Sequence, residues 1–199
     1  MHRPDSRPPA ALAEHAADQL AFIRDTMVRA GRFTAVSGSG MIGTGVVGVV
    51  AAVLSPRMSS PMQWFLLWLG AAAAAITVSL TAVARKARRS GQSLRAGPAR
   101  TFALAFAPPL AAGALLTAAL AVAGHWSLMP GTWLLCYGAA VVSGGAFSVR
   151  AVPVLGSVLV LLGAVTLFAP IAAQAWLLGA GFGAAHLLFG LFIVRYHGG

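Results

Sequence analysis

The chain has 199 residues, of which 58% are hydrophobic and only 9% are charged. Soluble domains carry about 25% charged residues, so a water-soluble globule of this length is excluded. Lys and Arg number 14 against 4 Asp and Glu, which gives a formal net charge of +10. The single cysteine excludes an intrachain disulfide and a zinc site built from several cysteines. This composition predicts a polytopic membrane protein.

The first 32 residues hold all four acidic groups and no long apolar run. Residues 1–9 are predicted to be a disordered N-terminus. Residues 10–32 are predicted to form a cytoplasmic amphipathic helix, because apolar residues recur there at three- and four-residue steps, for example at Leu20, Ile23 and Met27. Two interpretations stay open for this helix: an anchor lying on the membrane surface, or a docking site for a cytoplasmic protein or a second subunit.

Six apolar stretches follow, and none of them contains Asp, Glu, Lys or Arg. They are residues 33–54, 63–84, 101–123, 131–149, 152–169 and 172–194. A helix that crosses a bilayer needs roughly 20 mostly apolar residues. We therefore expect an all-α fold, a polytopic bundle of six transmembrane helices over residues 33–195, preceded by the amphipathic helix. Pro170 interrupts an otherwise apolar run, so a five-span alternative remains.

The basic residues are distributed unevenly between the gaps. Thirteen of the 14 fall on the side of the membrane that holds the N-terminus, six of them in the predicted basic cytoplasmic loop at 85–100. The positive-inside rule then places both termini in the cytoplasm. It also explains the net charge without nucleic acid, which is not expected as a partner.

Tryptophans collect near the opposite ends of the spans, where an indole prefers the membrane interface. The residues predicted to anchor the protein in the lipid bilayer are Trp64, Trp126, Trp133, Trp176, Arg85, Lys86, Arg88 and Arg89.

Small residues at four-residue spacing predict close helix packing, because lipid tails do not themselves drive helices together. The glycines expected at such contacts are Gly40, Gly48, Gly144, Gly179, Gly183 and Gly190. The pattern does not distinguish contacts within one chain from contacts in a homo-oligomer.

His186 lies within the sixth predicted span, and ionisable residues there are functional candidates. Several polar residues are expected at a similar depth in the cytoplasmic half: Ser143, Ser148, Arg150, Thr34 and Ser37. Together they predict a small polar pocket for a lipid headgroup or a small anion, with Arg150 as the cation. The alternative is that His186 only packs against a hydrogen-bonding neighbour.

A serine in span four and a histidine in span six also resemble the Ser/His pair of rhomboid intramembrane proteases, and AHLLFG at 185–190 is similar to their sixth helix. The serine segment VVSGG has Val141 where the rhomboid motif has glycine, which speaks against this activity. His125 and His186 are expected at opposite sides of the membrane, so they do not form a haem site. No catalytic, metal-binding or cofactor-binding residues are predicted.

Four segments resemble a group of bacterial six-helix integral membrane proteins: RFTAVSGSGMIGTG at 32–45, GPARTFALAFAPPLAAGALLTAAL at 97–120, YGAAVVSGGAFSVRAVPVLG at 137–156, and AHLLFG. The likeness covers most of the chain after residue 20 and implies no activity, ligand or partner.

The sequence thus favours a non-enzymatic binding or interaction protein of the membrane. Two alternatives stay open: a small transporter or channel subunit for a small or lipid-like solute, and a rhomboid-like intramembrane hydrolase.

Overall fold

The computed structural model describes residues 36–89, 91 and 97–197, and, nearer the N-terminus, residues 14, 17–20, 22, 23 and 27. The chain divides into two units, Met1–Arg32 and Phe33–Gly199. In the first unit, the described residues are helical and exposed, including Leu20 and Phe22. The predictions for residues 1–9, for most of 10–32 and for Thr34 lie outside the described residues.

The second unit is helical, and its described residues contain no strand. Its helices are α2 (Gly38–Leu54), α3 (Pro61–Arg89), α4 (Pro98–Val122), α5 (Met129–Gly145), α6 (Ala151–Phe168), α7 (Ile171–Leu178) and α8 (His186–His197). A short 3-10 turn, η1 (Ser55–Arg57), follows α2, and a second one, η2 (Trp126–Leu128), precedes α5. A π-helical segment, η3 (Gly179–Ala185), joins α7 to α8.

Five helical segments are long and apolar enough to cross a membrane: Gly38–Arg57, Pro61–Arg89, Pro98–Val122, Ala151–Phe168 and Ile171–Tyr196. The last of these runs without a break through α7, η3 and α8, after Pro170 has ended the preceding chain segment. The sixth predicted span corresponds to this segment, and the fourth corresponds to α5, which has 17 residues.

Helix α3 extends further than the predicted second span. It continues to Arg89, so part of the predicted basic loop forms the last turns of a helix. Lys and Arg are good helix formers, and their charges are favourable near the negative end of the helix dipole. Helix α4 then begins at Pro98, a residue whose fixed φ suits the first helical position.

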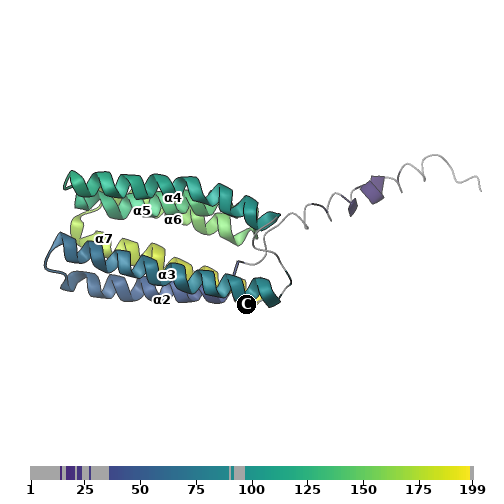
Figure 1. The fold of residues 1–199 in the computed structure, drawn as a ribbon, viewed down its shortest axis with the longest axis horizontal. Helices are drawn as coiled ribbons and strands as arrows, with labels where there is room; N and C mark the ends of the chain where they lie inside the picture. The colour runs from purple at the N-terminus through teal and green to yellow at the C-terminus, as the bar shows by residue number, and fades with distance from the viewer. Residues whose placement is uncertain are drawn as a thin grey trace, which may run out of the picture. The chain divides into compact units, whose positions relative to one another are not determined.

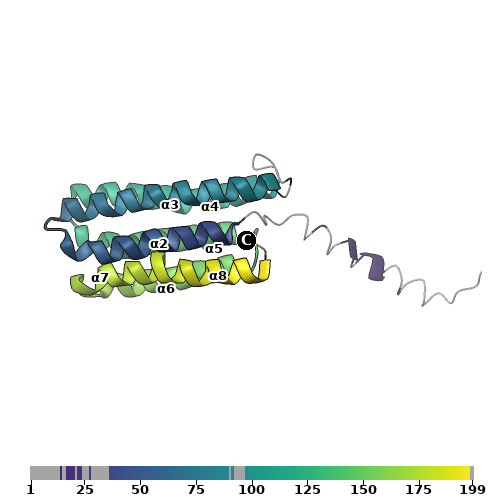
Figure 2. The ribbon, with the colours of Figure 1, turned by 90° about the horizontal axis from the view of Figure 1, so that it is seen from below.

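The helices of this unit form two layers of three, which Figure 1 shows one above the other. One layer holds α3, α2 and the α7–α8 segment, and the other holds α4, α5 and α6. Figure 2 shows the same bundle turned, with α2 and α5 in the middle row. Accordingly α2 contacts α3, η3 and α8, and α5 contacts α4 and α6. Helices α2 and α6 begin, and α3 and α8 end, at one end of the bundle, which we call the basic end.

Within each layer, helices meet backbone to backbone at glycines. A Cβ atom added to Gly156 of α6 would lie 2.6 Å from the backbone nitrogen of Val142 in α5. One added to Gly190 of α8 would lie 2.8 Å from the backbone nitrogen of Ile42 in α2. A real Cβ has no room at such distances, so only glycine allows these helices to approach so closely. Close approach increases the dispersion contacts that hold helices together in lipid.

The six glycines expected at helix contacts all face another helix. Gly48 faces the backbone of Phe182, and Gly183 faces Val49, so these two lie on either side of one contact. The others face different partners: Gly190 faces Gly38 and Ile42, Gly40 faces Ala82, Gly179 faces Ala52, and Gly144 faces Phe102 and Phe106. All these partners lie in the same chain.

Between the layers the contact is made by aromatic side chains. At the end opposite the basic end, Trp64 of α3 stacks on Trp133 of α5, with ring centroids 5.3 Å apart and planes 6° apart. Phe65 packs edge-on against Trp126 there. Trp176, by contrast, is 59% exposed on the surface of α7. Four tryptophans are expected at the membrane–water interface, and three of them therefore also join the two layers.

We expect Gly156→Ala to destabilise the bundle, because the added methyl group would push α6 away from the backbone of α5. Overpacking of this kind costs about 1–3 kcal/mol. Gly70→Ala is the matched control, since a Cβ there meets nothing within 4 Å. It should leave stability unchanged or raise it slightly, as alanine is the better helix former. The measurement is the thermal unfolding midpoint in one detergent; equal midpoints for the two variants would contradict the packing described.

Candidate functional site

His186 is the most deeply buried ionisable candidate from the sequence, with 2% of its surface exposed. It begins α8, directly after the π-helical segment. Its Nδ1 lies 2.9 Å from the carbonyl oxygen of Gly181. A carbonyl oxygen only accepts, so Nδ1 carries the proton. The other nitrogen, Nε2, then accepts a hydrogen bond from the hydroxyl of Tyr137 at 3.1 Å. Both ring nitrogens of a neutral histidine are therefore satisfied.

Aromatic rings surround this hydrogen-bonded pair. The rings of Tyr137 and His186 have centroids 5.6 Å apart, and Phe182 packs against both. Phe106 of α4 meets Tyr137 edge-on. Since Tyr137 belongs to α5 and His186 to α8, the pair ties one layer to the other. In the structure, His186 therefore lies in a packed and hydrogen-bonded environment.

The same contacts bear on the Ser143–His186 pairing. A serine nucleophile needs a histidine nitrogen within hydrogen-bond reach to take its proton. The nitrogens of His186 are bonded to Tyr137 and to Gly181 instead. Ser143 is half-buried in α5, about one and two-thirds turns beyond Tyr137.

Neither Tyr137 nor the π-helical segment was predicted from the sequence. A signal for Tyr137 was present, because a buried histidine needs a hydrogen-bonding partner and the chain has only 2 tyrosines. The π-helical segment GAGFGAA is rich in small residues, and π-helical turns are frequent at functional sites. No periodicity of the sequence, however, separates a π-helical turn from an α-helical one.

A first hollow, of about 250 Å³, lies at the basic end between the start of α2 and the end of α3. Its lining consists of Ser37, Ser39, Ala82, Arg85, Lys86 and Arg89. We call these residues the α2–α3 basic site. It combines two hydroxyl groups, three cationic side chains and the N-terminus of a helix.

Hydrogen bonds hold the two sides of the α2–α3 basic site together. Ser37 caps α2, accepting from the backbone N–H of Gly40 at 3.3 Å, and its hydroxyl lies 2.9 Å from that of Ser39. Lys86 of α3 donates to the backbone carbonyl of Val36 at 3.1 Å. Deeper in the same hairpin, Thr44 and Ser79 are hydrogen-bonded at 2.8 Å. The positive dipole end of α2 and the arginines of α3 therefore face one hollow, which suits an anion.

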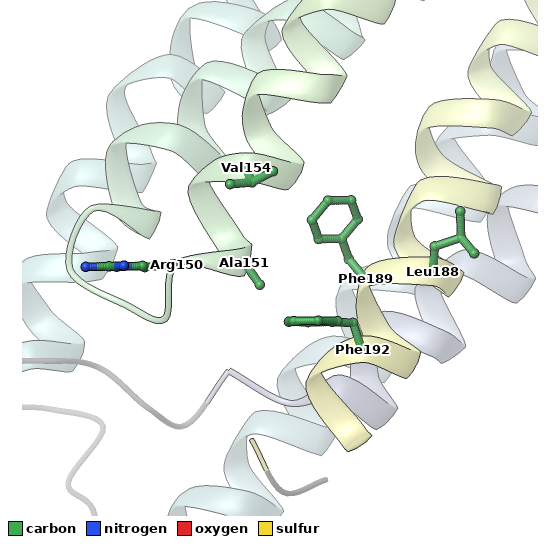
Figure 3. A pocket seen from close by; sticks show the side chains of 6 residues that line it. All are labelled: Arg150, Ala151, Val154, Leu188, Phe189 and Phe192. Atoms are coloured by element: carbon green, nitrogen blue, oxygen red, sulfur yellow. The ribbon is translucent and has the colours of Figure 1, made fainter. Parts of the chain in front are cut away.

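A second hollow, of about 540 Å³, lies at the basic end between α6 and α8. Its lining is Arg150, Ala151, Val154, Leu188, Phe189 and Phe192, which we call the α6–α8 groove. Figure 3 shows Phe189 and Phe192 pointing from α8 toward Ala151 and Val154. Apart from Arg150, the lining is apolar.

The predicted polar pocket is thus distributed over separate places. Ser37 belongs to the α2–α3 basic site and Arg150 to the α6–α8 groove, while His186 lines neither hollow. Ser148 is buried in the middle of the α5–α6 connection. Arg85, Lys86 and Arg89, expected only as membrane anchors, are the residues that join Ser37 around a hollow. Arg88 is exposed and is not in that lining.

Comparison with models of protein families, with curated proteins and with solved structures found no match. Among the residues that the structure describes, no group of three or more His, Cys, Asp or Glu side chains is placed to hold a metal ion.

Tyr137→Phe should destabilise the protein, because it removes the donor to Nε2 of His186 and leaves that nitrogen buried without a partner. Such a loss costs about 1–3 kcal/mol. The control is Tyr196→Phe, which removes the hydroxyl of a tyrosine that is 64% exposed and should change stability by less than about 0.5 kcal/mol. Unfolding by a denaturing detergent, followed by circular dichroism, measures the difference. Equal losses in the two variants would refute the bridging role of Tyr137.

Proposed function

We propose that this chain is a bacterial inner-membrane protein with six spans and both termini in the cytoplasm. Of the eight basic residues that the structure describes, seven lie at the basic end and only Arg57 lies at the other, which supports the cytoplasmic placement of the basic end. Helix α5, the fourth span in chain order, completes the six: the 3 residues of η2 directly precede its 17 residues, and it packs between α4 and α6. The resemblance to bacterial six-helix membrane proteins agrees with this topology.

The number of spans determines the side on which the chain ends. With six spans, a fluorescent protein fused after Gly199 should fold and fluoresce in a bacterial host, and alkaline phosphatase fused there should be inactive. With five spans, the two reporters would give the opposite result. A phosphatase fusion after Ser59, beyond α2, is the control for an external position and should be active.

Within this topology, we infer a non-enzymatic binding role in which the α2–α3 basic site holds a phosphate-bearing anion on the cytoplasmic side. The observation that carries it is the convergence of Arg85, Lys86 and Arg89 with the capped start of α2 on one hollow. Arginine and lysine are the usual phosphate-binding side chains, and backbone N–H groups at a helix start add to them.

Size and charge both support a small anion. A hollow of about 250 Å³ is below the range of about 300–1,000 Å³ typical of pockets for drug-sized ligands. Residues 33–199 contain no Asp or Glu, so no side-chain carboxylate of this unit neutralises the arginines. A phosphate group, free or as part of a lipid headgroup, supplies the missing negative charge.

The N-terminal unit supplies a second element of the proposed binding role. Its described apolar side chains Leu20, Ile23 and Met27 are more than half exposed and occur at helical spacing. We propose that they dock on a cytoplasmic protein or a second subunit, or rest on the membrane surface. Both roles require the cytoplasmic placement proposed for the basic end.

The binding role is favoured over the alternatives by the contacts of the core. Glycine contacts close each layer, and the Tyr137–His186 pair with its aromatic neighbours fills the space between layers. A transporter or channel subunit needs a path between helices that these contacts occupy. A Ser143–His186 hydrolase needs a histidine nitrogen that Tyr137 and Gly181 engage.

Arg85→Gln combined with Arg89→Gln should abolish the stabilisation of the protein by inorganic phosphate. A ligand at about 100 times its dissociation constant stabilises a protein by about 2.7 kcal/mol, so binding raises the thermal unfolding midpoint. The unmodified protein in neutral detergent should show this rise with phosphate but not with chloride at equal ionic strength. Arg57→Gln, at the opposite end of α2, is the control and should keep the rise. A rise of equal size in the double variant would refute the site.

A further inference from the structure

The α6–α8 groove is a concave apolar surface that opens on the outside of the bundle. Val154 is 53% exposed, Leu188 is 66% exposed and Phe192 is 46% exposed. Few contacts join α6 to α8, because these helices belong to different layers and each pairs within its own layer. A volume of about 540 Å³ lies within the range of ligand-binding pockets. The groove therefore has the size and the lining to hold a hydrocarbon chain.

Two arginines stand at the basic end of this groove. Arg150 precedes the first residue of α6, and Figure 3 shows its side chain leaving the backbone on the side away from Phe189 and Phe192. Arg195 follows Phe192 by three residues, so the two share a face of α8. Tyr196 contacts both Phe192 and Arg195. The ring centroids of Tyr196 and Phe192 lie 4.8 Å apart, and the guanidinium of Arg195 lies 5.8 Å from the ring centroid of Tyr196. Arg150 is the one charged residue of the lining, and Arg195 is exposed near the end of α8, outside the lining.

The order of these groups matches that of a phospholipid in the cytoplasmic leaflet. At 1.5 Å per residue, Val154 lies about 6 Å deeper along α6 than Arg150. Phe189 similarly lies about 9 Å deeper along α8 than Arg195. A headgroup at the arginines therefore places its acyl chain beside the valine and the phenylalanine. A water-soluble anion uses the arginines but gains nothing from the apolar lining.

The positive charges of Arg150 and Arg195 favour an anionic headgroup over a zwitterionic one. All four acidic residues of the chain precede residue 33, so the six-helix unit has no side-chain carboxylate to pair with Arg150 or Arg195. A phosphate of a zwitterionic lipid carries its own cation, whereas the phosphate of an anionic lipid does not. Basic pockets between transmembrane helices on the cytoplasmic side are the general setting for anionic headgroups.

We propose that the α6–α8 groove binds one anionic phospholipid of the cytoplasmic leaflet, with its acyl chain on Val154, Leu188, Phe189 and Phe192 and its headgroup at Arg150 and Arg195. This site depends on the proposed membrane topology and is separate from the α2–α3 basic site. Loss of phosphate binding at that site therefore leaves this proposal standing.

Native mass spectrometry tests the headgroup part of the proposal. The protein is reconstituted in vesicles of equal phosphatidylglycerol and phosphatidylcholine, released in mild detergent, and its bound lipids are counted. The unmodified chain should retain one phosphatidylglycerol in preference to phosphatidylcholine. Replacing Arg150 and Arg195 with glutamine should lower that preference by about fivefold for each charge removed.

The matched control removes the same charge from the same side of the membrane. Arg88 and Arg100 are exposed and line neither hollow, so their replacement by glutamine should leave the preference unchanged. An equal loss of preference in both double variants would overturn the proposal, because general attraction to the basic surface would then explain the selectivity. No preference in the unmodified chain would overturn it as well.

A second pair of variants tests the acyl-chain part. Val154→Trp should displace the bound phosphatidylglycerol by filling the groove. Val165→Trp is its control: this valine is 58% exposed and lies on nearly the same face of α6, three turns away. Both variants should keep the thermal unfolding midpoint, since both side chains are at the surface. A bound lipid that persists in Val154→Trp, or a dimer that carries no lipid, would refute the groove as a lipid site.

Discussion

The close approach of helix backbones at glycines is the constraint on which the rest of this structure depends. Neighbouring helices in lipid gain little from burying apolar side chains, so contact area must come from backbones that lie close together. The pairs Gly138 and Gly156 in one layer, and Gly48 and Gly183 in the other, leave no room for a Cβ atom. Each layer is thereby joined internally, and larger side chains remain for the space between layers.

The contact between the layers follows from this division. Aromatic rings fill the wider space, with Trp64 on Trp133 at one end and Tyr137 on Phe182 further along. The hydrogen bond from Tyr137 to His186 makes this contact specific as well as apolar. The α6–α8 groove opens between α6 and α8 at the basic end. The site proposed for a phospholipid thus lies where neither glycine contacts nor aromatic stacking joins two helices.

Much of the fold was predictable because hydropathy and glycine spacing are local properties. The apolar runs predict where helices lie, and the spacing of Gly40, Gly48 and Gly183 predicts which faces pack. The site was less predictable. The predicted polar pocket grouped Ser37, Arg150 and His186 only because they are expected at a similar depth in the membrane. Which helices are neighbours is a tertiary property: α2 begins beside the end of α3, and α6 begins beside α8. Residues at the same depth in the membrane are therefore far apart when their helices are not neighbours.

A cryo-electron microscopy structure of the full chain in nanodiscs that contain phosphatidylglycerol would test this packing. We expect α5 against α6 and α2 against α8, with Gly138 facing Gly156 and Gly48 facing Gly183 at backbone contact. A structure in which either glycine pair is separated by side chains or by lipid would contradict it.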